Sequence, residues 1–77
     1  MNKHFLGDVI KSKKGFYKCA RVTGGNAFFN GCKRNGTEVD YSDEIELPEH
    51  YTLDNRGLFF AKGYNWEIWT INKLSRK

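Results

Sequence analysis

Runs rich in aromatic and β-branched residues dominate the chain and predict β-strands. Residues 16–22 form the first such run, and side chains of this kind suit a pleated, half-buried surface. The turn sequence Thr23-Gly24-Gly25-Asn26 closes it, and residues 27–29 begin the next strand. Phe28 and Phe29 are adjacent, so on a regular strand they point to opposite faces. Either both faces of the sheet are covered, or one of these rings is exposed.

Two Asn-Gly dipeptides lie close together in the middle of the chain. Asn35-Gly36 predicts a two-residue hairpin turn, because both residues tolerate positive φ. Residues 37–41 then alternate, which predicts a strand with its apolar positions, Tyr41 included, inward and its two acids outward. Two hairpins do not fit in this stretch, so Asn30-Gly31 is assigned to a β-bulge.

The second half of the chain adds three predicted elements. The first is a helical turn over residues 42–47, which Ser42 caps and Pro48 ends. The second is a hairpin in which residues 51–53 and 58–61 flank a turn at residues 54–57, and the third is a last strand over residues 66–71. A helix would place Trp66 and Trp69 on one face, but the density of aromatic and β-branched residues favours the strand. Residues 72–77 form a basic tail whose order the sequence does not define.

The spacing of strands and turns predicts an all-β fold. Five or six short strands recur roughly every 8–12 residues, which is typical of an antiparallel barrel or sandwich. We expect a small antiparallel five- or six-stranded barrel, SH3-like or related, with one short helical turn. The 77 residues make a single domain, 1–77, with a thin core, to which twelve aromatic residues can contribute much of the apolar area.

Neither a targeting segment nor a membrane span is expected. The chain reaches Asp8 before any apolar run develops, whereas a signal peptide needs about 7–15 apolar residues there. The longest apolar run, residues 58–61, has four members. We therefore expect a cytoplasmic protein with no membrane partner.

Charge is sorted along the chain. Residues 1–34 hold eight Lys or Arg and one Asp, residues 35–54 hold seven acids and no Lys or Arg, and residues 55–77 hold five basic residues and one Glu. The overall net charge of +4 is therefore small because the opposite charges of these segments largely cancel. Sorted charge makes a directional field that steers partners, so it indicates binding rather than chemistry.

The two cysteines, Cys19 and Cys32, each lie in a strand-like stretch. Buried, reduced thiols that act as small hydrophobes are the favoured interpretation. A disulfide would need neighbouring strands in matched register. A zinc site would need His4 and His50 to join the cysteines, and no Cys-x-x-Cys or His-x-x-x-His pair pre-forms half of it.

Catalytic constellations are not found, and we predict neither enzymatic activity nor a cofactor. The chain has no Gly-x-Ser-x-Gly elbow and no phosphate-binding loop. Glu46, Glu49 and His50 could form an acid–base cluster, but a solvated acidic loop is the favoured interpretation. Cys19 is close in sequence to Lys18 and Arg21, which could lower the pKa of its thiol, but without a histidine at known distance it is not identified as a nucleophile.

A basic segment with interleaved rings is the candidate nucleic-acid site. Cations bind phosphates and exposed rings stack on bases, which suits RNA or single-stranded DNA. The candidate residues are Lys11, Lys13, Lys14, Phe16, Tyr17, Lys18 and Arg21. The alternative is that both rings belong to the core and the lysines only keep a loop solvated.

Acidic and aromatic residues supply the candidate protein-binding site. The candidates are Glu38, Asp40, Asp43, Glu44 and Glu46, together with Tyr64 and Trp66. Exposed Trp and Tyr are frequent in protein-binding hot spots, and complementary charge sets association rate and specificity. The alternatives are that the acids face the basic segments and neutralise them, or that a homodimer covers the second face of the sheet.

Several short segments match one family of small barrels. They are Gly7-Asp8-Val9-Ile10, the turn and strand 14–18, Val22, the Asn35-Gly36 hairpin and the acidic turn 42–47. Residues 7–47 thereby resemble the SH3-like small barrels, including the KOW type of ribosomal and transcription proteins. Cys19 and Ala20 stand where a KOW element has its second glycine, so RNA binding is not carried over. In style the chain also resembles short, Lys- and Asn-rich bacteriophage accessory proteins.

Three hypotheses of function follow. The first is a non-enzymatic module that docks on a protein through charged patches and exposed aromatics, as an inhibitor or adaptor of a host protein. The alternative is a small barrel that binds nucleic acid through residues 11–21. A structural subunit of a larger particle is the third possibility. Either a monomer or a homodimer is compatible with the sequence.

Overall fold

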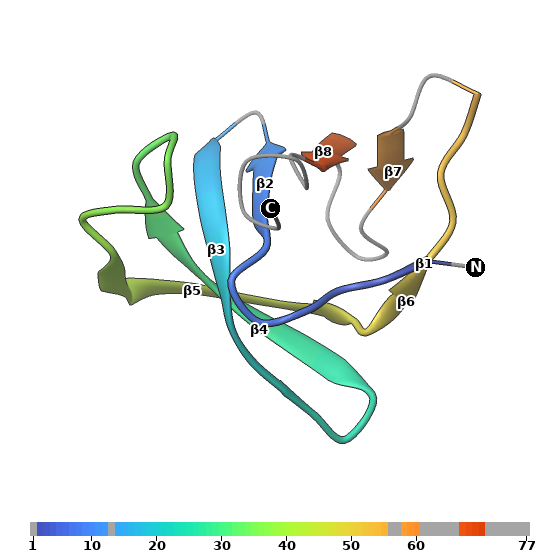
Figure 1. Ribbon diagram of the computed structural model, residues 1–77, viewed down its shortest axis with the longest axis horizontal. Helices are drawn as coiled ribbons and strands as arrows, with labels where there is room; N and C mark the ends of the chain where they lie inside the picture. Colours follow the sequence, from blue (N-terminus) through green and yellow to red (C-terminus); the bar gives the residue numbers. More distant parts are fainter. Residues whose placement is uncertain (1, 13, 56–57, 61–66, 71–77) are drawn as a thin grey trace.

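Antiparallel strands build the molecule, as the computed structural model shows (Figure 1). The structure describes residues 2–12, 14–55, 58–60 and 67–70. Its strands are β1 (Asn2–Lys3), β2 (Val9–Ser12), β3 (Gly15–Thr23), β4 (Asn26–Cys32), β5 (Asp40–Pro48), β6 (His50–Tyr51), β7 (Leu58–Phe60) and β8 (Glu67–Thr70). The part of the chain that is described contains no helix, and the predicted all-β class is confirmed.

The main sheet has six strands in the order β5-β4-β3-β2-β8-β7, and every pairing in it is antiparallel. Strands β2 to β5 form a meander. A second, two-stranded sheet pairs β1 with β6. Because β6 follows β5 and β1 precedes β2, this small sheet brings the two ends of the meander together, near the N-terminus in Figure 1.

The hairpin of β3 and β4 is the long, twisted arm in Figure 1. Thr23 pairs with Asn26, which leaves Gly24 and Gly25 as a two-residue loop. Both glycines have positive φ, 61° and 81°, as a hairpin turn matched to the twist of its strands requires. The turn predicted from Thr23-Gly24-Gly25-Asn26 is confirmed.

The connection between β4 and β5 differs from the prediction. Residues 33–39 form a loop in place of a strand: Gly36 N donates to Lys33 O, and Lys33 N donates to Thr37 O, both at 2.8 Å. The chain thus reverses one residue earlier than a two-residue Asn35-Gly36 turn would. Glu38 then takes a φ of 52°, which breaks the alternation on which the strand prediction rested.

The predicted helical turn over residues 42–47 is wrong, because these residues lie in β5. Ile45 pairs with Phe29 and Leu47 pairs with Ala27, and all four side chains are buried. Burial at every second position requires an extended backbone, and it outweighs the capping signal of Ser42 and the local preference of the acids. Pro48 ends β5, as it was expected to end the helical turn.

The Asn30-Gly31 irregularity is confirmed. Asn30 pairs with Glu44 and Gly31 pairs with Asp40, so three extra residues, 41–43, lie on β5. A Cβ at Gly31 would stand 2.6 Å from Asp43 Oδ2. A side chain at position 31 would therefore force the Asp43 carboxylate of this bulged segment to shift.

The hairpin predicted between residues 51–53 and 58–61 is also wrong. Tyr51 pairs with Asn2, and Leu58 pairs with Trp69 of β8. Asp54 and Leu58 are nevertheless hydrogen-bonded to each other, since Leu58 N donates to Asp54 Oδ1 at 3.1 Å and Asp54 N donates to Leu58 O at 2.8 Å. Long-range partners, which the sequence does not identify, determine the pairing. The strand predicted over residues 66–71 is found as β8 over residues 67–70, whereas residues 66 and 71 and the tail over residues 72–77 lie outside the described residues.

The core lies on one face of β3, β4 and β5. Its residues are Ile10, Tyr17, Cys19, Ala27, Phe29, Ile45 and Leu47, with Val22 and Tyr51 packed against them. Val9 is buried on the opposite face, where a Cβ at Gly36 would lie 3.2 Å from Val9 Cγ2. The loop over residues 33–39 therefore covers part of the second face.

Candidate functional site

The basic and acidic segments meet within one sheet. Strand β3 carries Lys18 and Arg21, strand β5 carries the acids, and β4 lies between them (Figure 1). Arg21 Nη2 and Glu44 Oε2 are 3.7 Å apart, with both side chains about half exposed, at 53% and 52%. The Arg21 guanidinium also lies 4.0 Å from the centroid of the Phe28 ring. The two blocks of charge are thus on the same face, with partial neutralisation across it.

The strand register defines which residues share this face. Paired residues in an antiparallel sheet project on the same side. Lys18 pairs with Asn30, which pairs with Glu44, and Arg21 pairs with Phe28, which pairs with Glu46. We call the surface made by Lys18, Arg21, Phe28, Glu44 and Glu46 the charged face. The core covers the opposite side of the same three strands.

The candidate nucleic-acid residues are divided between the two sides of the sheet. The ring of Tyr17 is 1% exposed and belongs to the core, with its hydroxyl 3.4 Å from Asp43 Oδ1. Phe16 is half-buried, and Lys11 Nζ lies 5.9 Å from the centroid of its ring. Lys14 is exposed, whereas Lys18 is half-buried beside Gly36. Lys13 lies outside the described residues. Phe16 is consequently the one ring of this set that a base could reach.

The acidic candidates gather on and beside β5. Asp40 is exposed, and it accepts hydrogen bonds from Ser42 N at 3.0 Å and Ser42 Oγ at 2.6 Å, which lower the pKa of its carboxyl group. Asp43 is half-buried, whereas Glu44 and Glu46 are exposed. Strand β5 thus carries four acids and no basic residue. Glu38 stands apart, exposed on the loop that precedes the strand.

Tyr41 is a surface residue that the sequence analysis missed. It was predicted to point inward, but its side chain is 78% exposed. The positive φ at Glu38 and the extra residues 41–43 shift the alternation, so the predicted inward position becomes an outward one. Asn30-Gly31 is the signal of this shift in the sequence, because it marks where the register breaks. We call Asp40, Tyr41, Asp43, Glu44 and Glu46 the acidic edge.

The place of β5 in the sheet adds to the picture given by these side chains. Strand β5 is the terminal strand of the six-stranded sheet, next to β4 alone among the described strands. The acidic edge therefore combines negative charge and an exposed ring on a terminal strand. Tyr64 and Trp66, the other protein-binding candidates, lie outside the described residues.

Both cysteines are free thiols on opposite sides of the sheet. Cys19 pairs with Phe29 on the core side, whereas Cys32 pairs with Phe16 on the other, so the two are not placed to form a disulfide. Burial raises the pKa of the Cys19 thiol to about 11 and also raises the pKa of Cys32. The idea that Lys18 and Arg21 lower the Cys19 pKa is therefore wrong.

His4 directly follows β1 and is buried. Its ring stacks on Tyr51 at a centroid distance of 4.4 Å and meets the edge of Phe29 at 4.9 Å. Desolvation lowers the pKa of His4 to about 4. His50, by contrast, is exposed. No three His, Cys, Asp or Glu side chains of the described segments gather as a metal site would require.

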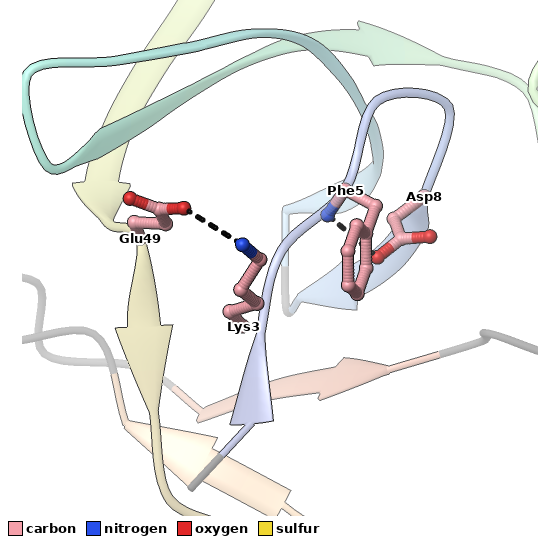
Figure 2. Close-up of polar contacts among 4 residues, drawn as sticks. All are labelled: Lys3, Phe5, Asp8 and Glu49. Carbon is pink, nitrogen blue, oxygen red and sulfur yellow. Dashed lines mark hydrogen bonds and ion pairs between the residues drawn. The ribbon is translucent and has the colours of Figure 1, made fainter.

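The N-terminal segment is attached by polar contacts (Figure 2). Lys3 Nζ lies 3.5 Å from Glu49 Oε2, and Phe5 N donates to Asp8 Oδ2 at 3.1 Å. Glu49, one of the three residues considered for an acid–base cluster, thus forms an ion pair with Lys3. Its contact links β1 to the end of β5 rather than to a catalytic group.

A shallow, polar depression lies beside the acidic edge. It has a volume of about 280 Å³ and is lined by Lys14, Gly15, Phe16, Tyr17, Gly31, Cys32, Lys33, Glu38, Asp40 and Asp43. Both signs of charge line it. Among the described residues of its lining there is no histidine, and burial raises the pKa of the one thiol, Cys32.

The chain matches no known protein-family model, no curated protein and no solved structure. The site must therefore be interpreted from its own geometry. Within the described part of the chain, no helix is long and apolar enough to cross a membrane.

Proposed function

We propose that this protein is a non-enzymatic binding module that docks on another protein through the acidic edge. The observation that supports it is the terminal strand β5, with four acids, no basic residue and the 78% exposed ring of Tyr41. Tyr is one of the residue types enriched in protein-binding hot spots, and the rim around such a hot spot is polar. Negative charge there repels a phosphate backbone and attracts a basic protein surface.

The architecture proposed for this module is a small barrel of the SH3-like type. The meander of β2 to β5 and the β1–β6 pairing that joins its ends support this arrangement. In that architecture the acidic edge is a rigid platform, because Ile45 and Leu47 anchor β5 in the core. Its biological role would be that of an inhibitor or adaptor of a host protein, of the kind encoded by bacteriophages.

Nucleic-acid binding is the second candidate function, favoured by Lys11 next to the half-buried Phe16 ring and by the exposed Lys14. It predicts an affinity that falls steeply with salt, with a log–log slope of about −1 per phosphate contacted. Binding of RNA or single-stranded DNA with that slope, unchanged by loss of Tyr41, would favour this function over the first.

A pull-down from bacterial lysate, with and without nuclease, tests the proposed function. We expect a stoichiometric protein partner that survives nuclease treatment and is lost with the variant Tyr41→Ser. Leu6→Ser is the matched control, since Leu6 is also largely exposed, at 67%, but lies outside β5. Recovery of nucleic acid alone, or equal loss with both variants, would contradict docking through the acidic edge.

A further inference from the structure

We propose that the end of the main sheet where the β2–β3 turn meets the loop after β4 binds single-stranded nucleic acid, and that it selects a base with an exocyclic amino group against Phe16. The inference goes beyond docking through the acidic edge. It rests on the second candidate function and develops it into a defined site. Two cations that the sequence analysis did not include, Lys33 and Arg34, belong to this site.

Strand pairing brings cations from distant parts of the chain to the Phe16 ring. Cys32, the last residue of β4, pairs with Phe16, which in turn pairs with Lys11 of β2. The loop that follows β4, green in Figure 1, therefore begins beside the start of β3. Lys14 and Lys33 line the same depression of about 280 Å³ as the ring. Positive charge thus surrounds one partly exposed ring.

Backbone hydrogen bonds hold the two basic loops in place. In the β2–β3 turn, Ser12 pairs with Gly15, and Lys14 N donates to Ser12 Oγ at 3.1 Å. In the loop after β4, Lys33 N donates to Thr37 O at 2.8 Å. These contacts use backbone atoms of the two lysines and leave their side chains exposed. A site held in this way loses little conformational freedom on binding.

The cations of this site are not neutralised within the described part of the chain. Two ion pairs occur among the described residues, and they involve other cations, Lys3 and Arg21. The exposed cations that form no ion pair with a described residue are Lys11, Lys14, Lys33 and Arg34. Such side chains suit phosphates, which bind Lys and Arg with release of counterions.

A second depression beside the first indicates the path of the strand. It has a volume of about 590 Å³ and is lined by Lys33, Arg34, Asn35, Thr37 and Glu38. Lys33 and Glu38 line both depressions, so the two adjoin at this point. A strand with one base against Phe16 can therefore continue past Lys33 toward Arg34, with its phosphates directed to these two cations.

A carboxylate in the first depression selects the kind of base. Asp43 is half-buried there, and its Oδ1 accepts a hydrogen bond from the Tyr17 hydroxyl at 3.4 Å. A carboxylate only accepts hydrogen bonds, and the 4-amino group of cytosine donates them, whereas uracil has no amino group. One nucleotide thus supplies a phosphate for the cations, a planar face for Phe16 and an N–H for Asp43. A duplex does not fit, because its bases are already paired and stacked.

Fluorescence anisotropy with labelled oligocytidine and oligouridine of equal length tests this inference on the wild-type protein. The two ligands have the same charge and differ only at the C4 position of the base. We expect oligocytidine to bind about tenfold more tightly, and a duplex to bind more weakly than either. Equal affinities for the two single strands would overturn the base contact, and tighter binding of the duplex would overturn stacking on Phe16.

Removal of single charges tests the role of the cations. Lys33→Gln and Arg34→Gln each remove a charge from the site, whereas the matched control Arg21→Gln removes one that is paired with Glu44. We expect the first two to weaken binding of oligocytidine and to make its log–log salt slope shallower by about 0.7–1, with little change in the control. Equal effects of all three variants would mean that net charge alone attracts the RNA, and would overturn the site.

Removal of a ring tests stacking. Phe16→Leu and Phe28→Leu each replace a half-buried ring on the same face of the sheet, but Phe28 lies beneath Arg21, away from the depressions. We expect Phe16→Leu to weaken binding of oligocytidine about tenfold and Phe28→Leu to leave it unchanged. Equal losses would contradict stacking on Phe16. The comparison of the two oligonucleotides on the wild-type protein does not depend on how these variants fold.

The outcomes separate this inference from the candidate functions. If oligonucleotides bind with neither base preference nor dependence on Phe16, nucleic-acid binding stands and the site proposed here is wrong. If none binds at low salt, the second candidate function fails as well. Capture of a protein that depends on Tyr41 is a separate result, because Tyr41 is not part of this site.

Discussion

The two faces of the sheet formed by β3, β4 and β5 serve different purposes. On one face Cys19, Phe29 and Ile45 pair across the three strands and are buried. On the other, the row of Arg21, Phe28 and Glu46 remains at least partly exposed. Phe28 and Phe29 are neighbours in sequence, yet one ring is covered by a guanidinium and the other has 0% exposure.

Strand alternation thus separates the residues that stabilise the fold from those that could contact a partner. Apolar burial contributes in proportion to the area removed from water, so the Phe29 face supplies most of the stabilisation. Exposed ion pairs contribute little, so the charged face can change its partners with little effect on folding. A small domain is only marginally stable, so a binding surface whose residues contribute little to folding suits it.

Truncating the two phenylalanines should give the largest contrast. Phe29→Ala leaves a cavity in the core and should lower the free energy of unfolding by about 3–5 kcal/mol. Phe28→Ala should cost roughly 1 kcal/mol, because its ring is only partly buried beneath Arg21. Denaturant unfolding followed by circular dichroism measures both values. Similar losses for the two variants would contradict the separation of the faces.

Acid should destabilise the core face next, through His4. The pKa of His4 is about 4 in the folded protein and 6.5 when unperturbed, so between these values the unfolded chain binds a proton that the folded one does not. Above pH 6.5, His4 therefore has no effect on the free energy of unfolding. Below pH 6.5 this free energy falls as the pH drops, and it stops falling below about pH 4. The full loss is about 3 kcal/mol, of which about 2 kcal/mol is reached near pH 5.

Two phenylalanine substitutions assign this pH dependence. His4→Phe keeps a ring against Tyr51 and Phe29 and removes the titrating group, so the loss of stability between pH 7 and pH 5 should shrink. His50→Phe is the matched control, because that side chain is exposed and makes no comparable core contact. Denaturation midpoints at both pH values measure the effect. An unchanged pH dependence in His4→Phe would place its origin elsewhere.

Local signals in the sequence predicted the core face better than the acidic edge. The β3–β4 hairpin was predicted because its turn glycines and its strand residues agree. The helical turn over residues 42–47 was wrong, because capping and charge are local preferences, whereas the pairing of Ile45 with Phe29 is a contact between distant residues. The same holds for Tyr51, whose partner Asn2 lies at the other end of the chain.

The acidic edge could be predicted only in part. The acids were identified from the sorted charge, but their place on a terminal strand depends on the order of the sheet, which no local pattern encodes. Tyr41 was missed because one positive φ, at Glu38, and a bulge moved it from the predicted buried side to the surface. Small backbone irregularities thus create the exposed features of this site.

The smallest expected effect is the coupling between Arg21 and Glu44. The side chains are half exposed and 3.7 Å apart, so a double-mutant cycle with Arg21→Gln and Glu44→Gln should give a coupling energy of only about 0–1 kcal/mol. Salt should reduce even this value, since exposed pairs are screened. Thermal or denaturant unfolding of the four proteins measures it. A coupling well above this range would mean that the charged face contributes to folding, and that Glu44 is not available to a partner without loss of stability.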